Sequence, residues 1–199
     1  MTKAVHTVGH SNGTAERLLG LLSQHGIMVV ADVRSQPYSR FNPQFNREEL
    51  AAALKASNLE YVFLGQELGA RSADPACYRD GRAQYSLIAR TALFEKGIER
   101  LLAGMENFRV AILCAEKEPL VCHRSILIGR YLHEKGFDVR HILEDGSVES
   151  HAASVLRLLG LHGMQENHLF HTRDELAAIA YEKQAEEIEY SATQSQQPA

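Results

Sequence analysis

The chain has 199 residues, of which 45% are hydrophobic and 23% are charged, and this balance is typical of one globular domain with a full core. The net charge of −4 excludes a globally basic nucleic-acid binder, although it leaves room for a local basic patch. The longest aliphatic run, at 27–31, is far shorter than the roughly 20 residues of a membrane span. With three cysteines and no signal-like N-terminus, the sequence predicts a cytoplasmic protein with reduced thiols.

Apolar segments alternate with segments of helical periodicity along the chain. The predicted strands cover residues 4–11, 27–34, 59–65, 108–114 and 137–143. The predicted helices lie between Thr14 and Gly26 and at 46–57, 83–106 (broken in the middle), 119–135 and 151–160. This alternation predicts a three-layer, doubly wound (Rossmann-like) α/β fold with a mostly parallel sheet of about five strands.

The chain divides into three predicted parts. Residues 1–165 are expected to form the α/β domain. Residues 166–190 are expected to form a charged, solvated C-terminal helix, and residues 191–199 a disordered tail. Within the domain, Asn46 and Glu49 resemble a capping box at the start of a helix. The loop at 66–81 is long for a compact domain, which favours a binding role.

Polar side chains follow four of the predicted strands. They are His10 and Ser11, Asp32 and Arg34, Cys114 and Glu116, and His141. Ligands of open parallel sheets bind beyond the carboxyl ends of the strands, so these residues predict one site at that edge.

Arginines and aromatic residues alternate in the segment 32–47, which contains Arg34, Tyr38, Arg40 and Phe41. Guanidinium groups bind phosphates and rings stack on bases, so the segment favours an anionic small molecule or a nucleic acid as partner. A lid that folds its rings onto the core is the alternative interpretation.

Two of the three cysteines lie in the stretch 112–125. Cys114 ends a buried strand, where a cysteine is more often a small apolar residue than a reactive one. Pro119 is well placed for the first turn of a helix, so Cys122 is predicted to lie within that turn or at its start, followed by His123 and Arg124. The helix N-terminus and these basic groups favour a thiolate at Cys122 and an anion pocket around it.

The spacing of the cysteines also bears on two other kinds of site, a cysteine-dependent catalytic loop and a metal centre. A phosphatase or sulfurtransferase loop of the cysteine type commonly has an arginine six residues after its cysteine. Leu120 and Leu127 stand at those positions, so the spacing does not fit such a loop. A zinc or iron site could use the side chains Cys114, Cys122, His123 and His10. The seven residues between the cysteines differ from a compact C-x-x-C motif, so we assign no metal ligand from the sequence.

Several motifs together resemble one family, the domain of unknown function 488. They are GHS (9–11), DVRSQPYSR (32–40), FLGQELGAR (63–71), ILC and CHR within 112–124, and HILEDG (141–146). The resemblance extends from about residue 4 to 160. It implies a compact α/β protein of bacterial or archaeal type, and it implies no reaction.

Taken together, the residues predict an enzyme-like domain that binds an anion at the strand edge. Cys122 is the candidate nucleophile or redox thiol, His10 the candidate base or second ligand, and Asp32 an orienting or proton-accepting group. Eight further residues are predicted to bind the ligand: Ser11, Arg34, Arg40, Cys114, Glu116, His123, Arg124 and His141. A nucleic-acid or nucleotide-binding module and a metal-binding protein are the alternatives, and the sequence assigns neither a cofactor nor an oligomeric state.

Overall fold

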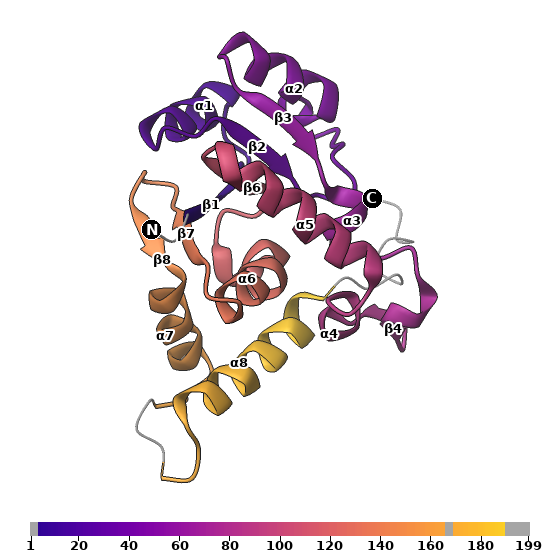
Figure 1. Ribbon diagram of the computed structural model, residues 1–199, viewed down its shortest axis with the longest axis vertical. Helices are drawn as coiled ribbons and strands as arrows, with labels where there is room; N and C mark the ends of the chain where they lie inside the picture. Colours follow the sequence, from indigo (N-terminus) through magenta and orange to yellow (C-terminus); the bar gives the residue numbers. More distant parts are fainter. Residues whose placement is uncertain (1–3, 166–168, 190–199) are drawn as a thin grey trace.

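Six strands form the central sheet of the computed structural model, which describes residues 4–165 and 169–189 (Figure 1). Their spatial order is β3 (Glu60–Phe63), β2 (Val29–Asp32), β6 (Val110–Cys114), β1 (Ala4–Gly9), β7 (Asp138–Ile142) and β8 (Val148–Ser150). The first five are parallel, and only β8 runs antiparallel, beside β7. The predicted doubly wound α/β fold is confirmed, and β8 is an additional edge strand that the sequence analysis missed.

Helices cover both faces of the sheet (Figure 1). Helices α1 (Ala15–Gln24) and α2 (Arg47–Ala56) pack on one face, where Leu18, Leu22, Leu50 and Leu54 meet Val8 and Val30. Helices α5 (Ala92–Asn107), α6 (Arg130–Glu134), α7 (His151–Leu161) and α8 (Arg173–Ile188) contribute to the core on the other face. Every residue of β2 and β6 is buried, as expected for central parallel strands.

The first two helices begin in different ways. The Thr14 hydroxyl accepts a hydrogen bond from the Arg17 amide at 3.2 Å and caps α1. Asn46 precedes α2 but makes no side-chain cap, so the predicted capping box is wrong. Its side-chain oxygen instead accepts the Ser39 amide at 2.7 Å, because the loop before α2 folds back over the helix start.

Helix α8 is not a solvated helix, contrary to the prediction. Leu176, Ala180 and Tyr181 are buried in the larger core, although six acidic residues occupy 172–190. The charged residues therefore occupy the outward side of a helix whose other side packs on the domain. The predicted tail at 191–199 lies outside the described residues. No helix in the described ranges is both long and apolar enough to cross a membrane.

The chain between β3 and α5 contains more structure than a loop. Helix α3 (Gly65–Leu68) comes first, followed by a 3-10 turn (Pro75–Cys77) and a small hairpin of β4 (Tyr78–Arg79) and β5 (Arg82–Ala83). Helix α4 (Tyr85–Ile88) then precedes α5, so the predicted break in the 83–106 helix is confirmed.

The predicted continuous helix at 119–135 is divided into three parts. A 3-10 turn spans Pro119–Val121, and Cys122 follows it in an extended conformation with φ −137° and ψ 138°. A π-helix (Arg124–Gly129) then leads into α6. Cys122 therefore precedes the helix instead of lying in its first turn.

Candidate functional site

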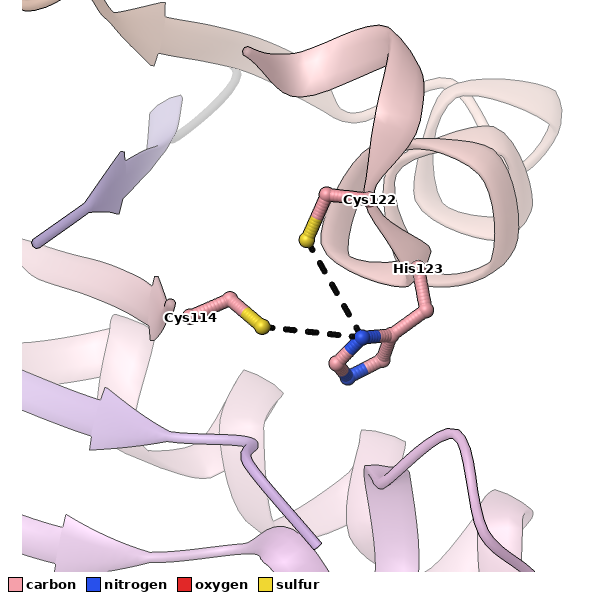
Figure 2. A group of neighbouring side chains, drawn as sticks. All are labelled: Cys114, Cys122 and His123. Atoms are coloured by element: carbon pink, nitrogen blue, oxygen red, sulfur yellow. Dashed lines mark hydrogen bonds between the residues drawn. The ribbon is translucent and has the colours of Figure 1, made fainter. Parts of the chain in front are cut away.

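Three side chains with metal-binding atoms meet beyond the end of β6 (Figure 2). Cys114 is the last residue of β6, while Cys122 and His123 come from the segment just before the π-helix. The two sulfur atoms lie 3.6 and 3.9 Å from Nδ1 of His123, and all three candidate ligand atoms lie within 4.8 Å of one another. All three residues are buried. Cys114 and Cys122 thus face the same point, although a cysteine that ends a buried strand is more often a small apolar residue than a reactive one.

Glu116 joins this group through one carboxylate oxygen. Its Oε2 accepts hydrogen bonds from the Cys114 thiol at 2.9 Å and from the Cys122 thiol at 3.0 Å. All four residues are candidates predicted from the sequence, and the structure brings them together. We call Cys114, Glu116, Cys122 and His123 the Cys/His/Glu cluster.

The orientation of His123 is set by a main-chain group. Its Nε2 lies 3.1 Å from the carbonyl oxygen of Val33, which only accepts hydrogen bonds. Nε2 therefore carries a proton, and in the neutral ring the lone pair is on Nδ1, the atom that faces both sulfurs.

Burial and neighbouring charges shift ionisation within the cluster. Burial and the nearby Cys122 raise the pKa of the Cys114 thiol well above its ordinary value. Burial also opposes ionisation of Cys122, but the Cys114 thiol, Arg124 and His123 together lower the pKa of Cys122 well below its ordinary value. Cys122 is therefore the sulfur that ionises first. Burial raises the pKa of Glu116 as well.

Arg124 holds the loop that follows β6. Its side chain is fully buried, and its guanidinium donates to the carbonyl oxygens of Glu116 and, at 2.9 Å, of Lys117. Its main-chain amide donates to Cys122 Sγ at 3.4 Å. Arg124 does not line the pocket described below, so it shapes the cluster instead of contacting a ligand there.

Gly9 at the end of β1 allows the same loop to approach the sheet. A Cβ atom at Gly9 would lie 1.8 Å from the Glu116 carbonyl oxygen, far inside van der Waals contact. Only glycine fits at this position, and the loop geometry that places Glu116 depends on it.

A pocket of about 350 Å³ opens on the cluster. Its polar walls come from several segments: Arg34, Ser35 and Gln36 after β2, Arg71 after α3, Tyr85 of α4, and Glu189 after α8. Tyr85 and Glu189 are not among the residues predicted for the site, because nothing in the sequence indicates that α4 and the C-terminal end of α8 meet at this edge of the sheet.

Asp32, Arg34 and His10 form a second network beside the cluster. Asp32 accepts the Arg34 Nε and Nη2 donors at 2.9 and 2.6 Å, and Tyr61 donates to the same carboxylate at 2.8 Å. His10 Nε2 lies 3.1 Å from Arg34 Nη1. Burial and Arg34 lower the pKa of His10 to about 4. His10 and Asp32 thus contact Arg34, and neither lines the pocket beside Cys122.

Three further predicted residues lie away from the pocket lining. Ser11, with φ of 54°, borders a separate cavity of about 20 Å³. Arg40 is exposed, and its guanidinium lies 5.0 Å from the ring centroid of the exposed Phe41. Tyr38 and Arg47 of the same segment are exposed as well, and the nucleic-acid-binding alternative stays a prediction.

His141, the third, belongs to a buried chain of hydrogen bonds. Its Nδ1 is 2.8 Å from the Thr7 hydroxyl, and its Nε2 is 2.9 Å from Nδ1 of His151. His151 Nε2 is in turn 2.7 Å from the Tyr181 hydroxyl. The chain connects β1, β7, α7 and α8, so His141 contributes to packing instead of to the pocket.

Comparison with known protein families gives a match over more than half of the chain. The family model described as "Domain of unknown function DUF488" matches residues 14–131, which include the whole cluster. No curated protein and no solved structure matched the chain.

Proposed function

Because the chain belongs to the DUF488 family, whose description assigns no reaction, we propose a function from the geometry: the Cys/His/Glu cluster binds one transition-metal ion. The observation that carries this proposal is the convergence of two sulfurs and the Nδ1 lone pair on a single point. The small pocket beside the cluster would give a ligand access to the ion.

The distances fit a tetrahedral ion. Bonds of about 2.3 Å to sulfur and 2.0–2.1 Å to nitrogen place these ligand atoms about 3.5 Å apart. The separations of 3.6 and 3.9 Å from the sulfurs of Cys114 and Cys122 to Nδ1 are close to that value. The carboxylate oxygen of Glu116, at 2.9 and 3.0 Å, is closer to the sulfurs than a metal would hold it. Metal binding would displace the thiol protons that lie between the two sulfurs and Oε2 of Glu116. Glu116 would then move slightly to become the fourth ligand, or a water would take the fourth position.

The surroundings support a metal centre in two further ways. Metal-bound histidines donate their other ring N–H to a carbonyl or carboxylate, as His123 does to Val33. Four ionisable groups buried together are costly unless something compensates their charge, and a divalent cation supplies that compensation. Thiolate and imidazole ligands select zinc or ferrous iron over magnesium or calcium.

Metal analysis of the purified protein tests the proposal. We expect about one zinc or iron per chain by elemental mass spectrometry. Cys114→Ser, Cys122→Ser and His123→Gln should each lose most of it. Cys77→Ser is the matched control, because Cys77 is a buried cysteine outside the cluster, and this variant should keep its metal. Metal-free protein that also fails to bind added zinc or ferrous iron would exclude the proposal.

Thiol chemistry at Cys122 is the second candidate function. Cys122 lines the pocket, and its Sγ accepts a hydrogen bond from the Arg124 amide at 3.4 Å and lies 3.0 Å from a carboxylate oxygen of Glu116. These contacts suit a nucleophilic sulfur. The test is the rate of iodoacetamide alkylation in chelator-treated protein. A nucleophilic Cys122 should react faster at pH 6–7 than an unperturbed thiol, and Cys122→Ser should remove the fast phase. If the fast phase is absent, the thiol candidate fails and the metal proposal is untouched.

A further inference from the structure

We propose that Arg34 and Arg71 form an oxyanion-binding subsite beside the cluster, so that the ligand of the pocket is a small molecule with a carboxylate or phosphate group. This inference rests on the proposed function, because it names the ligand class of the same pocket. Three arginines, Arg34, Arg40 and Arg124, are predicted from the sequence to bind the ligand. Of these three, Arg34 alone lines the pocket, since the guanidinium of Arg124 holds the 116–117 loop and Arg40 lies outside the pocket.

Arg34 presents unused donors to the pocket. A guanidinium carries five N–H groups, and the structure engages three of them, two with Asp32 and one with His10. The remaining two have no protein acceptor among the described residues. The side chain is only 9% exposed, and the exposed part borders the pocket that contains Cys114 and Cys122. Buried donors of this kind are usually satisfied, which points to an acceptor supplied by a ligand.

The guanidinium is held in place before any ligand arrives. Asp32 binds it through both oxygens and is itself fixed by the Tyr61 hydroxyl. His10 accepts from Nη1, donates from Nδ1 to the Ser11 carbonyl at 2.6 Å, and stacks on Phe45 at 4.1 Å between ring centroids. A fixed planar fork loses little freedom on binding an oxyanion, and this favours carboxylate or phosphate over a neutral group.

Charge is distributed unevenly around the pocket. Arg71 borders it on the same side as Ser35 and Gln36, to which its main-chain amide and Nη1 donate at 3.0 and 2.8 Å. Asp32 balances the charge of Arg34, and Arg71 is the second arginine in the lining of the pocket. Glu189 borders the pocket too, held by the Tyr85 amide and the Gln84 side chain at 3.0 Å each. An anion would therefore turn toward the arginines and away from Glu189.

The size of the pocket restricts the ligand further. At about 350 Å³ it is at the lower end of the range for ligand pockets, roughly 300–1,000 Å³. One small molecule fits, with its anionic group at Arg34 and its other end near the cluster.

Calorimetric titration of chelator-treated protein tests the subsite without involving the metal. Inorganic phosphate and acetate are the two probes, and we expect at least one to bind. Arg34→Gln should weaken that probe by about tenfold, and Arg71→Gln by a smaller factor. Glu189→Gln should strengthen it by about threefold, because a repulsive charge is removed. Arg40→Gln is the matched control, since Arg40 is exposed outside the pocket, and it should change nothing.

The outcomes separate the two sources of the anionic group. Binding of phosphate alone identifies a phosphate-bearing ligand, and binding of acetate alone a carboxylate-bearing one. Binding of neither probe, or equal weakening by Arg34→Gln and Arg40→Gln, overturns the proposal. If Arg34→Gln does not fold, the other two variants still test the proposal. Anion binding that is unchanged in both Arg71→Gln and Glu189→Gln would overturn it. Metal content is measured separately, so a missing subsite and a missing metal centre are distinguishable.

Discussion

The main-chain carbonyl of Val33 lies 3.1 Å from Nε2 of His123 and determines which ring nitrogen faces the two sulfurs. Val33 immediately follows β2 and immediately precedes Arg34. One strand end therefore orients the imidazole of the cluster with its main chain and, one residue later, supplies the guanidinium that borders the same pocket. The two parts of the candidate site share this anchor, so a change that shifts the end of β2 should affect both.

Metal binding should stabilise the folded protein. A ligand that binds only the native state adds about 2.7 kcal/mol to the free energy of unfolding when its concentration is about 100 times Kd. Urea unfolding of chelator-treated protein with and without zinc measures this gain. Cys114→Ser should lose the gain, and Cys77→Ser should keep it. Equal stabilisation of Cys114→Ser would mean that zinc binds elsewhere.

Replacing Gly9 with alanine should damage the site and the fold together. The new Cβ would lie 1.8 Å from the Glu116 carbonyl oxygen, so the 116–117 loop or β1 must move. We expect a loss of about 3 kcal/mol in the free energy of unfolding, together with weaker metal binding. Urea unfolding and metal analysis of the variant measure the two effects.

Gly20 provides the matched control for that substitution. It lies in α1, and a Cβ atom there would have nothing within 4 Å, so Gly20→Ala should raise stability by about 0.5–1 kcal/mol. Similar effects from the two substitutions would contradict the proposed role of Gly9.

Arg124 should tolerate replacement poorly even when its charge is kept. Lysine cannot reproduce the two guanidinium bonds to the carbonyls of Glu116 and Lys117. We expect Arg124→Lys to cost about 2–3 kcal/mol and to lower metal affinity, because Glu116 is then less well placed. Arg140→Lys, at a half-exposed arginine paired with Asp138, should stay within about 0.5 kcal/mol of the wild type. Urea unfolding measures the stability of both variants, and metal analysis measures their metal binding. Equal losses in the two variants would contradict the role given to Arg124.

The sequence predicts the location of the site better than its arrangement. Apolar runs such as 27–34 and 108–114 identify central parallel strands, and the carboxyl-edge rule then places Arg34, Cys114 and Glu116 near one another. The position of Cys122 could not be predicted in the same way. It depends on the break between a 3-10 turn and a π-helix, and no local propensity encodes that break.

The roles of several residues depend on contacts distant in sequence. His10 looked like a base for Cys122, but Arg34 folds back onto Asp32 and takes the His10 acceptor. Glu189 reaches the pocket only because Tyr181 and its neighbours pack α8 against the domain. The acidic residues of that helix predict a fully solvated segment, and the sequence alone does not reveal that one side of the helix is buried.

Acid should destabilise the protein through the buried histidine chain of Thr7, His141, His151 and Tyr181. Burial lowers the pKa of His151 to about 3 and lowers the pKa of His141 well below its ordinary value of 6.5. The folded state therefore favours neutral rings, while the unfolded state takes up protons below pH 6.5. The stability that depends on the neutral rings is present above about pH 6.5 and is lost progressively as the pH falls.

His151→Gln tests the contribution of one ring. From pH 7 to pH 5 we expect the wild type to lose about 2 kcal/mol in the free energy of unfolding through His151 alone, and the variant to lose that much less. The groups that face His151 are His133, His141 and Tyr181, with Arg130 over the Tyr181 ring. Tyr181→Phe is the control, because it removes the hydrogen bond to His151 and keeps the ring that titrates. This variant should lose stability at both pH values and retain the pH dependence of the wild type. If His151→Gln and the wild type show the same pH dependence in urea titrations, the neutral His151 ring does not account for the acid sensitivity.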